Sequence, residues 1–195
     1  PPEDEVIGVT NERAASGKRA LVLERRLDGQ YAYGFDFHKR LADADDWVEV
    51  RYAFMTRGSA LDAGFSFYLR SNWPTNANVL EVRQTKGRFV LIPKTGTREQ
   101  RRNNRPRLGE YESGRWFRVT LWAPLGKASG EMAVARLERL RPDGRWEPTG
   151  ARARTRVKVP DPFGHLFFIP PPGARLYVDD VRIVTDSEPP DKGDQ

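Results

Sequence analysis

Hydrophobic and polar residues alternate with a period of two along most of the chain, and the clearest example runs from Arg115 to Ala123. One set of alternate positions, Phe117, Val119 and Leu121, is entirely apolar, and the other set mixes tryptophan with arginine and threonine. Successive side chains of a β-strand point to opposite faces. The pattern therefore predicts a strand with one face in a core and the other on a surface.

Similar stretches recur between turn-forming residues such as Asp28-Gly29, Lys86-Gly87 and Pro142-Asp143-Gly144. The segment Glu131–Leu140 suits a helix or a strand, and the turns beside it favour a strand. We expect an all-β fold, a two-sheet antiparallel β-sandwich of jelly-roll type with about ten or eleven strands. Residues 1–185 would form one domain, and residues 186–195 a disordered tail or linker.

The segment Lys94–Arg107 is the longest one without a strand pattern. It contains six basic residues and a single acidic residue, Glu99. Blocks of like charge are usually solvated and mobile, and long irregular loops are usually functional or disordered. We therefore expect an irregular, mobile arm here.

Composition excludes several classes of protein. The 195 residues include no cysteine, which rules out disulfides and cysteine-based sites. No apolar run approaches the ~18 residues that a membrane-spanning helix needs. The net charge of +6 raises nucleic-acid binding as a possibility, but acidic residues are interspersed throughout and no recognition motif is present. We expect no nucleic-acid partner.

The outward positions of the predicted strands carry arginine, glutamate, tyrosine and tryptophan. If these strands are neighbours in one sheet, they form one polar-aromatic surface. Aromatic rings suit the C–H faces of sugars, and arginine suits hydroxyl, carboxylate or sulfate groups. The alternative is an ordinary solvated face with cross-strand Glu–Arg pairs. The candidate ligand-binding residues, including one tryptophan from a loop, are Arg51, Tyr68, Arg70, Trp73, Glu81, Arg83, Arg118 and Trp122.

Three stretches carry a resemblance to known proteins: Ser16–Leu23, Gly114–Val119 and Leu176–Ile183. They resemble the opening strand, the "G-x-W-x-x-V" strand and the closing strand of jelly-roll carbohydrate-binding modules and concanavalin A-like lectin and glucanase domains. The resemblance implies an extracellular or periplasmic module that binds a polysaccharide or oligosaccharide, neutral or anionic. Such modules are often attached to an enzyme.

In the last of these stretches the inward parity switches across Asp179-Asp180, which predicts a β-bulge. In the modules that it resembles, an acidic residue at this point often joins a structural calcium site. The resemblance thus implies Asp180 as a calcium ligand. The alternative is a bulge with two solvated carboxylates.

Catalytic signatures are weak. His38 and His165 lack zinc-site spacing, and no nucleophile-elbow motif is present. Glycoside hydrolysis needs two opposed carboxyl groups, for which Glu49 and Glu81 are candidates by parity. A polysaccharide lyase needs a base such as Tyr68 beside an arginine. We expect non-catalytic carbohydrate binding, with a lyase, a glycoside hydrolase or a structural interaction domain as the alternatives.

Overall fold

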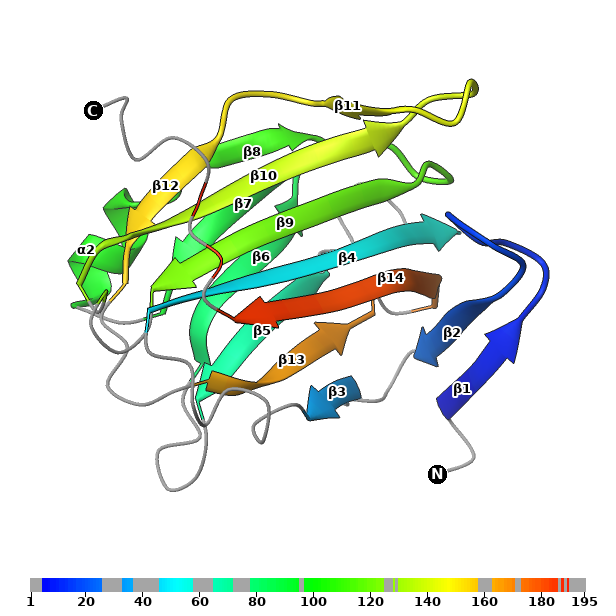
Figure 1. Cartoon of the computed structure of the whole chain (residues 1–195), viewed down its shortest axis with the longest axis horizontal. Helices are drawn as coiled ribbons and strands as arrows, with labels where there is room; N and C mark the ends of the chain where they lie inside the picture. Colours follow the sequence, from blue (N-terminus) through cyan, green and yellow to red (C-terminus); the bar gives the residue numbers. More distant parts are fainter. Residues whose placement is uncertain are drawn as a thin grey trace.

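The computed structural model describes residues 5–25, 33–36, 46–57, 65–71, 78–94, 97–124, 128, 130–157, 163–170, 173–185, 187 and 189. Within these residues the chain is almost entirely β-structure, arranged as two antiparallel sheets (Figure 1). The predicted all-β sandwich is confirmed. The expected tail lies outside the described residues except for Ser187 and Pro189. No described helix is long and apolar enough to cross a membrane.

Sheet A contains eight of the described strands. Their order is β1 (Glu5–Thr10), β2 (Ala20–Arg25), β14 (Arg175–Thr185), β4 (Trp47–Arg57), β9 (Phe117–Pro124), β10 (Met132–Leu140) and β11 (Trp146–Pro148), with β12 (Ala153–Arg156) also paired to β10. The strand predicted from Arg115 to Ala123 is β9, which lies between β4 and β10 near the middle of the sheet.

Sheet B contains the other six described strands. Their order is β3 (Tyr33–Asp36), β13 (Phe163–Ile169), β5 (Ser66–Ser71), β6 (Asn78–Thr85), β7 (Arg88–Pro93) and β8 (Arg107–Glu110). The described strands thus exceed the ten or eleven expected, because short strands such as β8 and β11 carry too few positions to show alternation.

One short helix, α2 (Arg98–Asn103), lies between β7 and β8 in the described part of the chain. The prediction that the whole segment Lys94–Arg107 is irregular is therefore wrong. The helix sequence REQRRN is rich in Arg, Glu and Gln, which have good helix propensity. The charge of this segment alone gives no indication of its helix propensity.

The inner faces of the two sheets enclose one aromatic core. Phe54 of β4 lies 4.6 Å from Phe67 of β5 and 5.8 Å from Phe117 of β9, measured between ring centroids. Such aromatic pairs add about 0.5–1.5 kcal/mol each beyond the area that they bury. The apolar set of β9 is fully buried, as its alternation predicts. Complete burial also raises the pKa of Tyr52 well above its usual value.

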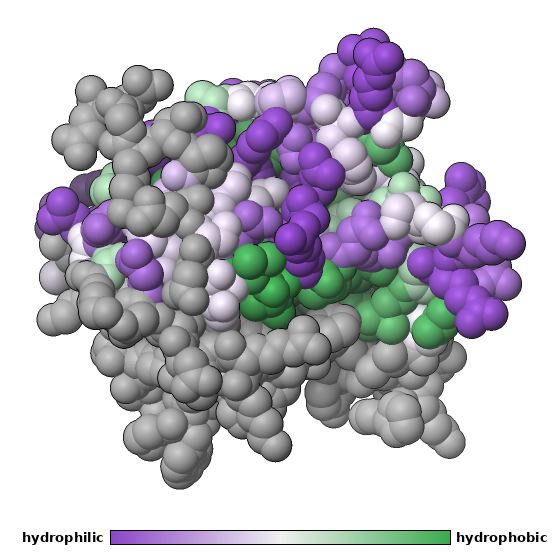
Figure 2. All heavy atoms as spheres, in the orientation of Figure 1, coloured by the Kyte–Doolittle hydropathy of each residue, from purple (hydrophilic) through white to green (hydrophobic). Residues whose placement is uncertain are grey.

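A second apolar layer covers part of the outer side of sheet A. Trp116 and Tyr177 pack with Ala53 and Met55 in one cluster. A separate cluster contains Trp47, Trp122, Ala128 and Val134. Figure 2, seen from the side of sheet A, shows hydrophobic residues across the middle of this face between hydrophilic ones. The outer tryptophans of this sheet are therefore packing residues.

The predicted bulge in β14 is confirmed. The pairing of β14 with β4 shifts register between Asp179 and Arg182, and Asp180 has a φ of 50°. The Asp179 carboxylate accepts backbone hydrogen bonds from Ala15 and Ser16 at 2.9 and 3.0 Å. Asp180 accepts a hydrogen bond from the Ser16 hydroxyl. The bulge thus ties the segment between β1 and β2 to the closing strand.

Candidate functional site

The predicted ligand-binding residues do not form one surface, because their strands belong to different sheets. Sheet A carries Arg51, Arg118 and Trp122, whereas sheet B carries Tyr68, Arg70, Glu81 and Arg83. The single-face prediction is therefore wrong. Parity tells which side of a strand a residue occupies, but not which sheet the strand joins. Trp73 lies outside the described residues.

The residues on sheet A are engaged with their own neighbours. Trp122 is only 5% exposed, so the prediction that it faces a ligand from the surface is wrong. Arg118 donates a hydrogen bond of 2.8 Å from Nε to Glu138, and its guanidinium lies 4.6 Å from the ring centroid of Trp146. Arg51 is half-buried and lies opposite Thr120 and Arg182.

The residues on sheet B form a continuous outward row. Tyr68 of β5 pairs in register with Glu81 of β6 on one side and with Phe167 of β13 on the other. Residues directly opposite each other in antiparallel strands point to the same face. The intervening residues Leu69 and Val82 belong to the core, so the row points away from it. The sheet-B site is defined here as Ser66, Tyr68, Arg70, Glu81, Arg83, Lys94, His165 and Phe167.

Glu81 is the organising residue of the sheet-B site, although it is fully buried. Its Oε1 accepts hydrogen bonds of 2.6 Å from the Ser66 hydroxyl and from Nε of Arg83. Its Oε2 forms an ion pair with the Lys94 ammonium. Burial alone raises the pKa of Glu81, but the hydrogen bonds from Lys94 and Ser66 and the charges of Arg83 and Lys94 outweigh it and lower the pKa.

Glu81 is therefore an ionised carboxylate near neutral pH, already surrounded by donors from the protein. It is poorly suited to donate a proton or to contact a ligand directly. Its effect is to fix the positions of Arg83 and Lys94, whose side chains stay 38% and 22% exposed. A buried anion that orients two accessible cations provides a preorganised place for a second, incoming anion.

Tyr68 lies between these cations and is half-buried. Its hydroxyl interacts with Arg83 and Ser66, and the Lys94 ammonium lies 5.3 Å from its ring centroid. Burial and the negative charge of Glu81 raise the pKa of Tyr68 despite the hydrogen bonds from Arg83 and Ser66. At neutral pH, Tyr68 is a phenol that can donate a proton, beside two positive charges.

A third cation and more aromatic surface lie toward β13. The guanidinium of Arg70 lies 5.5 Å from the ring centroid of Phe167. His165, which pairs in register with Arg70, has its ring 5.9 Å from that of Phe167. Arg83 and Lys94 share the one carboxylate of Glu81, which leaves that cluster with a net positive charge. The site therefore combines positive charge with partly exposed aromatic rings.

Four members of the sheet-B site are absent from the candidate residues of the sequence analysis: Ser66, Lys94, His165 and Phe167. Lys94 falls within the segment predicted to be irregular, although it continues the outward parity of Val90 and Ile92. His165 and Phe167 lie in β13, where the neighbouring residues are mostly apolar. Their common parity, opposite to that of the buried Leu166 and Phe168, was the signal that could have found them.

Two other predictions concern a catalytic pair of Glu49 with Glu81 and a calcium site at Asp180. Glu49 lies on sheet A and Glu81 on sheet B, so the two do not form a catalytic carboxylate pair. Around Asp180, the described residues do not provide a cluster of three or more acidic, histidine or cysteine side chains able to hold a metal ion. The carboxylates of Asp179 and Asp180 instead accept hydrogen bonds from Ala15 and Ser16. Calcium at Asp180 stays a prediction.

Two packed antiparallel sheets of this kind form a β-sandwich of the jelly-roll type. No protein-family model matches the chain, and no curated protein matches it in sequence. Solved structures do match it over nearly its whole length, which supports this assignment of the fold.

An endo-β-1,4-glucuronan lyase from the fungus Trichoderma reesei matches with a TM-score of 0.62 and 10% identity, covering 94% of this chain and 88% of the lyase. An alginate lyase from Aplysia kurodai matches with a TM-score of 0.61 and 10% identity, covering 92% and 87%. The catalytic domain of a β-glucanase from Podospora anserina matches with a TM-score of 0.54 and 11% identity, covering 93% and 80%.

Proposed function

We propose that the protein binds acidic polysaccharides across the sheet-B site. The observation that carries the proposal is the placement of Arg83 and Lys94 by the buried Glu81, on either side of the Tyr68 phenol. Arginine matches the geometry of a carboxylate, and lysine supplies a compact positive charge. The rings of Tyr68 and Phe167 offer apolar surface to the C–H faces of a sugar.

Neutral sugars are a weaker fit. They offer hydroxyl groups but no negative charge, so they would gain nothing from the positive charges of Arg83 and Lys94. The names of two proteins with this fold, a glucuronan lyase and an alginate lyase, make those polymers the first ones to test. We also propose an extracellular or periplasmic location, where such polymers occur.

The proposal is tested by measuring affinity for glucuronan, alginate and two neutral polymers, cellulose and laminarin. We expect binding to the acidic polymers that weakens as salt rises, because partly exposed charges are screened. Arg83→Gln should weaken this binding at least tenfold. Equal affinity for the neutral polymers, or no loss in Arg83→Gln, would contradict the proposal.

A second candidate function, cleavage by a lyase, is favoured by the position and pKa of Tyr68. In β-elimination a base removes the proton at C5 of a uronate, a C4=C5 double bond forms and the C4–O bond breaks. Arg83 and Lys94 would neutralise the carboxylate, and Tyr68 would donate its proton to the leaving oxygen. His165 is a diagonal cross-strand neighbour of Tyr68, a spacing of roughly 7–8 Å, and would act as the base.

Turnover separates the two candidates. A lyase releases unsaturated uronates, which are detected by their ultraviolet absorbance, whereas a binding module releases nothing. If the protein is a lyase, Tyr68→Phe should lower kcat by about 10²–10⁴ with little change in affinity, as expected for loss of a general acid. If both the wild type and Tyr68→Phe bind the polymer and release no unsaturated uronate, the lyase function is excluded and the binding function remains.

A further inference from the structure

A groove lined by positive charge lies beside the sheet-B site. It has a volume of about 1030 Å³, and its walls include Ile92 of β7 and Lys94, which follows β7. The remaining cations come from α2 and the turn after it, and Glu99 is the one acidic residue in the lining. The arginines of this groove are Arg98, Arg101, Arg102 and Arg105.

The backbone holds these arginines close to Lys94. The α2 residue Arg101 donates a hydrogen bond of 3.0 Å from its backbone N–H to the carbonyl of Thr97, and its Nη1 lies 3.4 Å from the Lys94 carbonyl. Arg105 donates a bond of 3.0 Å to the Arg101 carbonyl. After α2, the Pro106 carbonyl accepts a hydrogen bond of 2.9 Å from Leu91 in β7.

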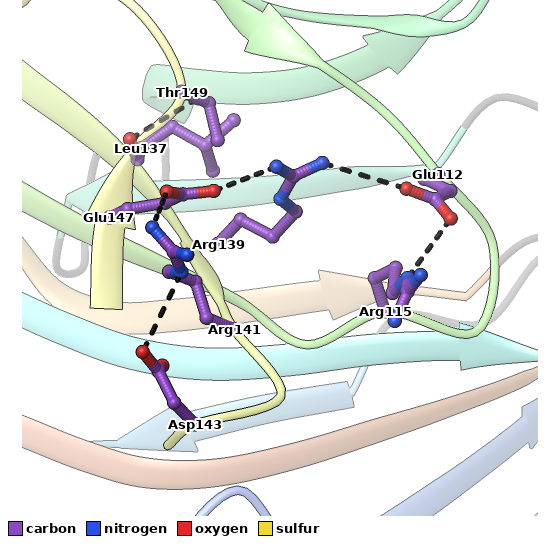
Figure 3. Close-up of polar contacts among 8 residues, drawn as sticks. All are labelled: Glu112, Arg115, Leu137, Arg139, Arg141, Asp143, Glu147 and Thr149. Atoms are coloured by element: carbon purple, nitrogen blue, oxygen red, sulfur yellow. Dashed lines mark hydrogen bonds and ion pairs between the residues drawn. The ribbon is translucent and has the colours of Figure 1, made fainter. Parts of the chain in front are cut away.

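The four arginines differ from Arg139 and Arg141 at the end of β10. Figure 3 shows Arg139 between Glu112 and Glu147, and Arg141 between Glu147 and Asp143. In the part of the chain that the structure describes, none of the four α2-region arginines is within ion-pair distance of a carboxylate. Concentrated positive charge without counterions opposes folding through self-repulsion and attracts an external anion.

Lys94 connects this groove to the sheet-B site, because it lines the groove, pairs with Glu81 and lies over the ring of Tyr68. We propose that the groove is an extension of the sheet-B site that binds further acidic sugars of the same polymer. The inference rests on the proposed function and adds to it the class of ligand. That ligand is a chain with negative charges on consecutive sugars, longer than the sheet-B site alone.

The test compares long-chain glucuronan with a glucuronate tetramer, in a Tyr68→Phe background if the wild type cleaves the polymer. Arg98→Gln/Arg102→Gln removes two exposed charges from α2. Arg141→Gln/Arg145→Gln removes the same charge from the β10–β11 hairpin of sheet A and is the matched control. We expect the α2 variant to bind long glucuronan at least tenfold more weakly at low salt and to bind the tetramer as the wild type does.

Counterion release predicts in addition that the α2 variant loses about one to two units from the slope of log affinity against log salt. The control variant should keep both the affinity and the slope. If wild-type protein binds glucuronan but the α2 variant behaves like the control, the groove is not part of the site and the proposed function stands. If the wild type binds no acidic polymer, both fail. Tighter binding of single-stranded DNA, lost in the α2 variant, would assign the groove to a different partner.

Discussion

The buried carboxylate of Glu81 fixes the positions of charged side chains on the outer face of sheet B. It points outward from sheet B, yet it is covered by the side chains that it attracts, and its hydrogen bonds fix Ser66, Arg83 and Lys94 around one point. In the sequence, Glu81 is one of several outward acidic residues. Its distinct role depends on Ser66 and Lys94, which reach it from the two neighbouring strands and which no local pattern connects to it.

Replacing Glu81 by glutamine should destabilise the fold, because Arg83 and Lys94 would lose their shared counterion. Loss of one partner from a fully buried pair costs about 3–5 kcal/mol, and the partial exposure of both cations reduces this to roughly 1–3 kcal/mol. Chemical denaturation at neutral pH measures the difference. A variant as stable as the wild type would show that Glu81 is not what holds the two cations.

The pH dependence of stability gives a second test of the same residue. The pKa of Glu81 is lowered in the folded protein. Its contribution to stability is therefore present above the unfolded value of about 4.3 and is lost as the pH falls through the folded value. We expect the difference in stability between wild type and Glu81→Gln to shrink over this acid range. A difference that stays constant down to the acid transition would contradict the assigned pKa shift.

Trp122→Ala tests the assignment of the second apolar layer on sheet A. The indole packs against Trp47, Ala128 and Val134, so its removal should cost about 3–5 kcal/mol of unfolding free energy. Leu121→Ala, in the main core, should cost a comparable 2–5 kcal/mol. A loss of unfolding free energy below about 1 kcal/mol for Trp122→Ala, measured by thermal and chemical denaturation, would show that Trp122 is a surface residue and not a packing residue.

At the scale of elements, alternation in the sequence predicts the inner face of each long strand. The buried set of β9 and the bulge in β14 both follow from parity alone. Membership of a sheet does not follow, because it depends on hydrogen bonds between segments far apart in the chain. For this reason the sequence does not separate β4 and β9 from β5 and β6, and it predicts only half of the candidate site.

The bulge in β14 carries a prediction about calcium and backbone strain. Asp180 has positive φ, a conformation that costs most L-residues about 1–2 kcal/mol. Asp180→Ala should therefore lower stability by about that amount, whereas Asp180→Asn should be nearly neutral. If Asp180 binds calcium in the folded protein, chelator should lower the Tm of the wild type but not that of Asp180→Ala. A wild-type Tm that chelator leaves unchanged would contradict the calcium site.

At the scale of the whole molecule, the two outer faces of the sandwich have different characters. On sheet A the outward arginine Arg118 is neutralised by Glu138, and Trp47, Trp116 and Trp122 are buried. On sheet B, Arg83 and Lys94 share the carboxylate of Glu81, Arg70 lies over the ring of Phe167, and the α2 groove adds further positive charge. The central claim is that the acidic polymer binds to the sheet B side.

The most direct test is the affinity for long-chain glucuronan of two double variants that remove equal charge from opposite faces. Arg70→Gln/Arg83→Gln alters sheet B, and Arg51→Gln/Arg118→Gln alters sheet A, with the Tm of each measured to confirm folding. We predict at least a tenfold loss of affinity in the sheet B variant and less than a twofold change in the sheet A variant. Equal losses, or a larger loss from the sheet A variant, would contradict the placement of the site.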